Sequence, residues 1–246
     1  MTAIVVIAKE CVPGRVKTRL HPALSYEQAA ALAAASLDDT LAAALALPAT
    51  RRILAFDGVV PPVTAAAFEI LPQVSGGLDE RLAAVFDSIE EPVLLVGMDT
   101  QQLTATLLDP VFSDWDRATD AWFGPARDGG FWSLALGEPQ PGVSRGDLIR
   151  GVPMSRNDTG TRQLARLRNA GLRVRQLPLL TDVDTIADAD AVARIAPHSR
   201  FASALRAMRT GGTDATGPDA TGFTSGKGPL QLPMGRANSH GRCNVG

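Results

Sequence analysis

The sequence predicts an α/β protein, in which a mostly parallel, Rossmann-like sheet lies between two layers of helices. Short apolar runs rich in β-branched residues, such as residues 4–8 (IVVIA), are typical of strands buried on both faces. Longer helix-forming stretches alternate with these runs through most of the chain. This alternation favours parallel strands joined by helical crossovers, and therefore a three-layer α/β/α fold.

The first elements carry the clearest local signals. A loop at residues 9–24 follows the strand at residues 4–8, and the Ala-rich stretch 26–47 predicts a helix. Ser25 stands at the N-cap position with Gln28 three residues later, which is the pattern of a capping box. We therefore expect this helix to begin directly after Ser25 and to end before the following proline.

The remaining elements continue the alternation. Further strands are predicted at residues 53–56, 68–71, 93–96, 121–124, 131–136 and 172–177, and further helices at residues 79–88, 104–112, 159–170, 186–195 and 200–208. In sheets of this kind, ligands bind outside the carboxyl ends of the strands. Functional residues are therefore expected directly after residues 8, 96, 124 and 177.

Length and composition predict a single domain. The chain has 246 residues, of which 45% are hydrophobic, and this is enough for one sizeable core. Residues 1–209 are expected to form one α/β domain. From residue 210 onward Gly, Thr, Ser and Pro dominate and the apolar periodicity ends, so residues 210–246 are predicted to be a disordered tail.

The overall charge excludes several classes of partner. With 24 basic and 26 acidic residues the net charge is −2, which does not favour a nucleic acid or a membrane surface. No apolar stretch is long enough for a membrane span or a signal peptide, and the two cysteines form no disulfide framework. We therefore expect a cytoplasmic protein. Only three histidines are present, so Lys, Arg, carboxylates and a metal are the groups left for catalysis.

A basic loop follows the first strand. Lys9, Arg15, Lys17 and Arg19 place four cations in eleven residues, and Gly14 allows the backbone to approach a ligand closely. The glycine spacing matches neither a P-loop nor a dinucleotide-binding fingerprint. A solvated basic loop is the alternative interpretation. The position after a parallel strand favours phosphate binding, with Arg able to bind phosphate oxygens in bidentate fashion.

Carboxylates follow two other predicted strands. Asp99 comes just after the strand at residues 93–96, where it would hold Mg²⁺ or Mn²⁺ against substrate phosphates. Helix capping is the alternative, but Thr104 is better placed to cap the next helix. In the segment 182–185 (DVDT), Asp182 and Asp184 project to the same side of an extended chain, and one of them could join Asp99 at a metal. The alternative is that Asp184 or the adjacent threonine caps the helix at residue 186.

Two glycine-containing segments allow both a structural and a functional interpretation. Residues 124–132 (GPARDGGFW) fit an ordinary hairpin turn, or a loop that lines an acceptor pocket with Asp128 as ligand or base. Residues 76–82 (GGLDERL) fit a helix start with acidic residues in its first turn, or a contact to the base or ribose of a nucleotide.

Taken in this order, these segments resemble a group of bacterial transferases of GT-A-like, nucleotide-diphospho-sugar transferase fold. The group was formerly filed as a domain of unknown function and is often labelled glycosyltransferase. The matching segments are residues 13–20 (PGRVKTRL), 39–40 (DT), 76–82 (GGLDERL), 97–99 (GMD), 124–131 (GPARDGGF) and 182–185 (DVDT). The fold is related to that of 2-phospho-lactate and molybdenum-cofactor guanylyltransferases.

The resemblance implies a nucleotide or nucleotide-sugar donor, a small acceptor and a divalent cation, Mg²⁺ or Mn²⁺. It implies metal binding by Asp99 and Asp184, and catalytic roles for Lys17 and Asp128. The residues implied to bind the nucleotide and its phosphates are Gly14, Arg15, Lys17, Arg19, Gly76 and Arg81.

The sequence departs from the family pattern at three positions. Gln101 stands where the family usually has proline, Asp79 replaces a glycine, and Met98 replaces a small polar residue. Three functions follow from this set. The first is glycosyl transfer from a nucleoside diphosphate sugar, the second is nucleotidyl transfer with release of pyrophosphate, and the third is nucleotide binding without catalysis.

Overall fold

The computed structural model describes residues 2–115, 119–139 and 142–210, which all fall within one compact unit, Met1–Gly212. The tail predicted at residues 210–246 lies outside the described residues except for Thr210, and its disorder stays a prediction.

A single sheet of seven strands forms the centre of this unit, in the order β3-β2-β1-β4-β6-β5-β7. The strands are β1 (Ala3–Lys9), β2 (Arg52–Asp57), β3 (Glu69–Pro72), β4 (Val93–Gly97), β5 (Ala121–Pro125), β6 (Phe131–Leu136) and β7 (Val174–Gln176). Only β6 runs against its neighbours, because it pairs antiparallel with both β4 and β5. The other pairs are parallel, which confirms the predicted mostly parallel sheet.

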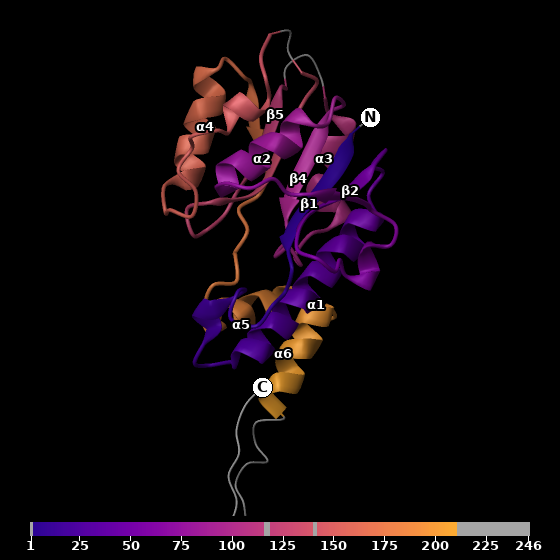
Figure 1. Ribbon diagram of the computed structural model, residues 1–246, viewed down its shortest axis with the longest axis vertical. Coiled ribbons are helices and arrows are strands. Elements are labelled where there is room, and N and C mark those ends of the chain that lie inside the picture. Colours follow the sequence, from indigo (N-terminus) through magenta and orange to yellow (C-terminus); the bar gives the residue numbers. More distant parts are fainter. Residues whose placement is uncertain (1, 116–118, 140–141, 211–246) are drawn as a thin grey trace, which may run out of the picture. The chain divides into compact units, whose positions relative to one another are not determined.

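Helices cover both faces of the sheet (Figure 1). They are α1 (Tyr26–Leu45), α2 (Leu78–Asp87), α3 (Ala105–Ser113), α4 (Thr159–Asn169), α5 (Ile186–Ile195) and α6 (Arg200–Thr210). Alternate residues of β1 point to opposite faces: Ile4 and Val6 pack in the cluster that contains α1 and α3, whereas Val5 packs in the cluster that contains α2 and α4. This confirms the predicted three-layer arrangement.

Helix α1 connects the sheet to a smaller cluster formed with α5 and α6. The capping box of Ser25 and Gln28 is present as predicted. Farther along α1, Asp39 accepts hydrogen bonds from the backbone N–H groups of Arg200 and Phe201. Because these are otherwise unpaired donors of the first turn of α6, Asp39 fixes where α6 begins.

The strand order places a topological switch point between β1 and β4. The chain proceeds from β1 to β2 on one side, whereas β6, β5 and β7 lie beyond β4 on the other side. The six parallel strands end at one edge of the sheet, which we call the carboxyl edge. The loops after β1, β4, β5 and β7 meet there, and this is where sheets of this type bind ligands.

Strand β7 is shorter than the predicted strand at residues 172–177. It forms the end of the sheet and pairs only with β5, and the chain reaches Pro178 soon after it. Proline supplies no N–H for the ladder, and pairing resumes only at Leu180, which forms an isolated bridge with Ala126.

Candidate functional site

Lys17 lies at the switch point, where the loops after β1, β4 and β7 meet. Its Nζ is 2.6 Å from Asp99 Oδ2 and donates a hydrogen bond of 2.7 Å to the carbonyl oxygen of Val183. The Lys17 backbone has a left-handed conformation (φ 47°, ψ 35°). Lys17 directly precedes the short 3₁₀ helix Thr18–Leu20. The side chain is only 12% exposed, so the ammonium group is held inside the site.

The surroundings of Lys17 keep it charged. Burial by itself lowers the pKa of the amine, but the ion pair and hydrogen bond to Asp99, together with the charges of Asp184 and Asp182, raise it above its usual value. A positive charge is therefore fixed between carboxylates at neutral pH, where it can meet a phosphate.

Asp99 is held by a tight loop after β4. Thr100 Oγ1 donates to the Gly97 carbonyl, and Thr40 Oγ1 of α1 donates to the Met98 carbonyl at 3.2 Å. One carboxylate oxygen of Asp99 pairs with Lys17, whereas Oδ1 is buried and has no hydrogen-bond partner among the described residues. A buried oxygen without a partner is costly unless something compensates it, and a hard divalent cation would do so.

The segment after β7 brings two further carboxylates to this edge. Asp184 Oδ2 lies 2.7 Å from Arg19 Nη1 at the surface of the site. Burial, and then the charges of Asp128 and Asp99, raise the pKa of Asp182 to about 7. Asp182 therefore lies close enough to other carboxylates for their charges to oppose its ionisation, and a cation bound among them would favour the ionised form. Among the described residues, however, no group of three or more His, Cys, Asp or Glu side chains is arranged as a metal cluster.

Helix capping does not account for the two aspartates. Thr185 is the N-cap of α5 and forms a capping box with Asp188. The capping interpretation of the DVDT segment therefore applies to its threonine. Neither Asp182 nor Asp184 is used as the cap.

Three adjoining hollows run along the carboxyl edge. The largest has a volume of about 360 Å³ and includes Gln73, Arg81, Asp99 and Asp182 in its lining. A second hollow of about 230 Å³ has a more apolar lining with Asp128 at its edge, and a third of about 200 Å³ is lined by Lys9, Lys17, Arg19, Asp99 and Asp184. Asp99 lines both the first and the third hollow, and Asp182 lines both the first and the second.

The structure brings together four of the predicted site residues: Lys17, Arg19, Asp99 and Asp184 line one hollow. Arg81 borders the neighbouring hollow, where its Nη1 is 2.6 Å from Asp57 Oδ2 and its Nε donates to the Gly76 carbonyl.

Three residues predicted to bind the nucleotide and its phosphates, Gly14, Arg15 and Gly76, line none of the three hollows. Gly14 has a positive φ of 75°, which permits the turn of the basic loop, and both Gly14 and Arg15 are exposed. Lys9 Nζ donates to the Arg15 carbonyl, and this contact fixes the loop from within.

The loop between β5 and β6 requires a glycine at position 129. Gly129 has φ 89°, and a Cβ there would lie 1.9 Å from the carbonyl oxygen of Asn157. The Gly129 carbonyl accepts a hydrogen bond from Gly160 N at the start of α4. Asp128 accepts from the Gly130 N–H, so the turn orients its carboxylate beside the apolar hollow.

The sequence did not mark Gln73 as a site residue, and it placed Phe131 and Trp132 only within a segment that could line an acceptor pocket. Gln73 Nε2 donates to the carbonyls of Ala8 and Ala55 at the ends of β1 and β2. Phe131 and Trp132 line the first two hollows. The aromatic pair directly after the DGG turn was the available signal, whereas no sequence pattern marks Gln73.

Two of the three residues that depart from the family pattern, Gln101 and Asp79, form hydrogen bonds within the fold. Gln101 is buried and accepts from Ser36 Oγ of α1. Asp79 Oδ2 accepts from the Gly151 N–H and links the start of α2 to the segment before α4. These two substitutions are therefore built into the fold of this chain.

The strand order defines a Rossmann-like α/β fold, and the solved structure described below shows that this fold is of the nucleotide-diphospho-sugar transferase type. The chain belongs to the family described as "Uncharacterized protein conserved in bacteria (DUF2064)", whose pattern matches residues 29–156, more than half of the chain. No curated protein matches the sequence. In the described part of the chain, none of the helices has the length and apolar character needed to cross a bilayer.

Solved structures resemble this fold. A candidate nucleotide-diphospho-sugar transferase from Desulfovibrio desulfuricans G20 is 26% identical, with 85% of this chain and 97% of that chain covered and a TM-score of 0.71. A cytidylyltransferase from Leptospira borgpetersenii is more distant, at 10% identity, 90% and 99% coverage and a TM-score of 0.49.

Proposed function

We propose that the protein is a metal-dependent transferase that uses a nucleotide donor, and that it transfers a glycosyl group from a nucleoside diphosphate sugar to a small acceptor. The observation that carries this proposal is the buried Lys17, held between Asp99 and the Val183 carbonyl at the switch point. The similarity to the Desulfovibrio protein supports a transferase with this type of donor.

The cations of the first loop are assigned to the donor phosphates. Lys17 is fixed by its two contacts and needs little reorganisation when charge develops on the departing diphosphate. Arg19 is 73% exposed and pairs with Asp184, so it can turn toward a phosphate oxygen at little cost. Gly14 and Arg15 would complete the phosphate contacts from the outer part of the loop.

Asp99 and Asp184 are the proposed ligands of Mg²⁺ or Mn²⁺. The unpartnered Oδ1 of Asp99 fits such an ion, because these cations take carboxylate oxygens together with phosphate oxygens. When bound, the ion would supply positive charge beside the donor phosphates. Because its pKa is raised to about 7, Asp182 is only partly charged at neutral pH, and a bound cation would favour its ionised form.

The acceptor is assigned to the apolar hollow. Leu82, Phe131, Trp132 and Met154 contribute its walls. Of the two carboxylates that line this hollow, Asp128 is exposed and Asp182 is half-buried. Asp128 would accept a proton from an acceptor hydroxyl, with its orientation set by the Gly130 N–H. On the other side of Asp99, Arg81 would contact the nucleoside part of the donor. Gly76, which is outside the lining of that hollow, would support this contact through its carbonyl, which accepts from Arg81 Nε.

The test is to incubate the protein and Mg²⁺ or Mn²⁺ with a panel of nucleoside diphosphate sugars, and separately with nucleoside triphosphates, each with small hydroxyl and phosphate acceptors. Release of nucleoside diphosphate from one sugar donor is expected. Asp99→Asn should lower this rate by at least ~100-fold, since loss of one electrostatic group commonly costs 10²–10³ in kcat. Asp109→Asn is the matched control, because Asp109 is exposed on α3.

Each outcome has a defined meaning. Release of pyrophosphate from a triphosphate would show that the transferred group is nucleotidyl and would overturn glycosyl transfer. Calorimetric binding of nucleotide without turnover of any donor would show a silent binding protein. Equal rates for Asp99→Asn and the parent protein would show that Asp99 has no role in the reaction.

A further inference from the structure

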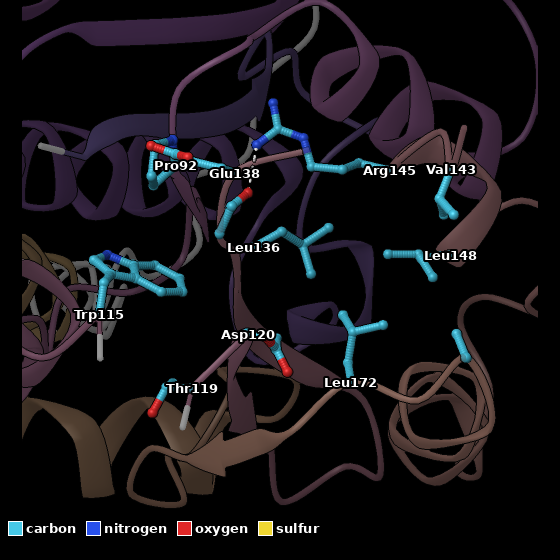
Figure 2. Close-up of a pocket in the computed structure, with 12 residues that line it drawn as sticks. Pro92, Trp115, Thr119, Asp120, Leu136, Glu138, Val143, Arg145, Leu148 and Leu172 are labelled. Atoms are coloured by element: carbon cyan, nitrogen blue, oxygen red, sulfur yellow. Dashed lines mark hydrogen bonds between the residues drawn. The ribbon is translucent and has the colours of Figure 1, made fainter. Parts of the chain in front are cut away.

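A separate cavity of about 490 Å³ lies at the opposite, amino edge of the sheet. Pro92, which precedes β4, and Leu136, the last residue of β6, both line it. Figure 2 shows Leu136, Leu148 and Leu172 gathered on one side, with Trp115 across from them and Arg145 above. Because β4 spans the sheet between Pro92 and the loop that carries Asp99, this cavity is distinct from the candidate active site.

Arg145 is a buried cation without adequate compensation. It is 5% exposed, and its Nη1 donates to the carbonyls of Glu91 and Gly137 at 2.9 and 3.0 Å. Its Nη2 is buried without a partner, and no described residue forms an ion pair with the guanidinium. Burial lowers its pKa, although Asp87 and Glu91 act in the opposite direction. Buried charges in proteins are normally paired, and among the described residues no carboxylate lies within ion-pair distance of this one.

The rest of the lining defines the chemistry of that anion. Leu136, Leu148 and Leu172 form an apolar wall, and Thr119 adds a second buried oxygen without a partner among the described residues. Two carboxylates, Asp120 and Glu138, also line the cavity. Asp120 is neutralised by Arg173 at 2.8 Å. With one guanidinium, whose buried Nη2 lacks a partner among the described residues, and an acidic side chain nearby, a single negative charge fits better than the double charge of a phosphate monoester.

We propose that this cavity binds a small amphiphilic carboxylate, whose carboxylate accepts hydrogen bonds from Arg145 and whose apolar part packs on the leucine wall. A buried arginine that meets a carboxylate gains charge-assisted hydrogen bonds, and the apolar part gains from its removal from water. The site is independent of the proposed transferase activity.

The experiment uses octanoate as the probe and methyl-labelled leucines in the full chain, observed by NMR. Octanoate is expected to shift the methyl signals of Leu136, Leu148 and Leu172 in a saturable manner, and to leave those of Leu78 and Leu82 beside the candidate active site unchanged. Octanol, which has the same chain without the charge, should bind at least ~10-fold more weakly, since charge-assisted hydrogen bonds are about twice as strong as neutral ones.

Arg145→Met should weaken octanoate binding at least ~10-fold and leave octanol binding unchanged. Because Arg145 also holds two backbone carbonyls, Leu172→Trp provides a second variant that fills the half-buried wall and keeps the guanidinium. It should abolish the shifts of Leu136 and Leu148. Equal affinity for octanoate and octanol, unchanged binding by both variants, or no saturable shift up to the solubility limit of octanoate would each overturn the proposal.

Discussion

At the scale of single residues, Cys11 reports on the charge around the candidate site. It packs partly buried against Val16, Ala30 and Ala33. Burial, followed by the negative charges of Asp99 and Asp38, raises the pKa of its thiol to about 11. The thiol is therefore protonated at neutral pH, although a cysteine beside a basic loop would ordinarily be expected to be reactive.

We predict that Cys11 reacts with iodoacetamide at pH 7.5 at least ~10-fold more slowly than glutathione, because the thiolate is the nucleophile and an ordinary thiol has a pKa near 8.5. The Cys243→Ser variant leaves Cys11 as the sole cysteine, and mass spectrometry measures its alkylation. The rate should still be rising at pH 10. A rate that levels off near pH 8.5 would contradict the raised pKa.

Gly129 is the residue whose replacement the fold should tolerate least. We predict that Gly129→Ala destabilises the protein by more than about 2 kcal/mol, because it adds a backbone clash to the strain of a positive φ. Gly151→Ala is the matched control: φ there is 75°, but a Cβ would meet nothing within 4 Å, so the cost should stay near ~1 kcal/mol. Urea unfolding measures both, and equal costs would show that the Asn157 contact is unimportant.

The candidate site could be predicted only in part from its residues. That Lys17 and Asp99 meet follows from their places after two adjacent strands of a parallel sheet. That Arg15 stays outside and Asp182 turns inward depends on how the loops fold. The left-handed backbone of Lys17 is one such feature, since spacing along a sequence does not reveal the dihedral angles of a non-glycine residue.

At the scale of elements, Asp87 joins the end of α2 to the segment before α4. Its Oδ1 accepts from Ser144 Oγ and Gly146 N, and its Oδ2 lies 2.6 Å from Arg150 Nη2. Partial burial alone would raise the pKa of Asp87, but these hydrogen bonds hold it below the usual value. A carboxyl with a lowered pKa stabilises the fold above its unfolded pKa and loses that contribution as the pH falls through the folded pKa.

We predict that Asp87→Asn lowers the free energy of unfolding at pH 7 by about 1–3 kcal/mol, the usual contribution of hydrogen bonds to a charged group. The penalty should shrink as the pH falls below ~4, the ordinary range of an aspartate pKa. Asp147→Asn removes an exposed partner of the same Arg150 and should cost under ~1 kcal/mol. Denaturant titrations at several pH values test this, and a penalty independent of pH would refute the electrostatic explanation.

Most elements could be predicted because their signals are local. The capping box at Ser25 and the Thr104 cap are contained within a few residues, and both are present. The placement of β6 between β4 and β5 was not predictable in this way. A hairpin pattern indicates that β5 and β6 pair, but which of them lies next to β4 depends on contacts between segments far apart in the sequence.

At the scale of the whole molecule, the predicted domain boundary can be tested directly. We predict that a chain ending at residue 210 has the same unfolding temperature and the same nucleotide affinity as the full chain. The physical reason is that the composition of residues 211–246 offers little apolar surface to bury. Differential scanning calorimetry and nucleotide titration of both chains provide the measurement. A lower unfolding temperature for the shorter chain would show that the tail contributes to the fold.

The contact between Lys17 and the Val183 carbonyl joins residues 166 positions apart, and this has a consequence for the order of events during synthesis. A ribosome-bound chain exposes Lys17 and Asp99 long before the segment after β7 leaves the exit tunnel. Until then, the lysine lacks its second anchor and Asp184 is absent. The nascent protein would therefore be unable to bind a nucleotide until nearly all of the domain has emerged. Nucleotide binding by a ribosome-bound chain would then indicate that the domain has folded.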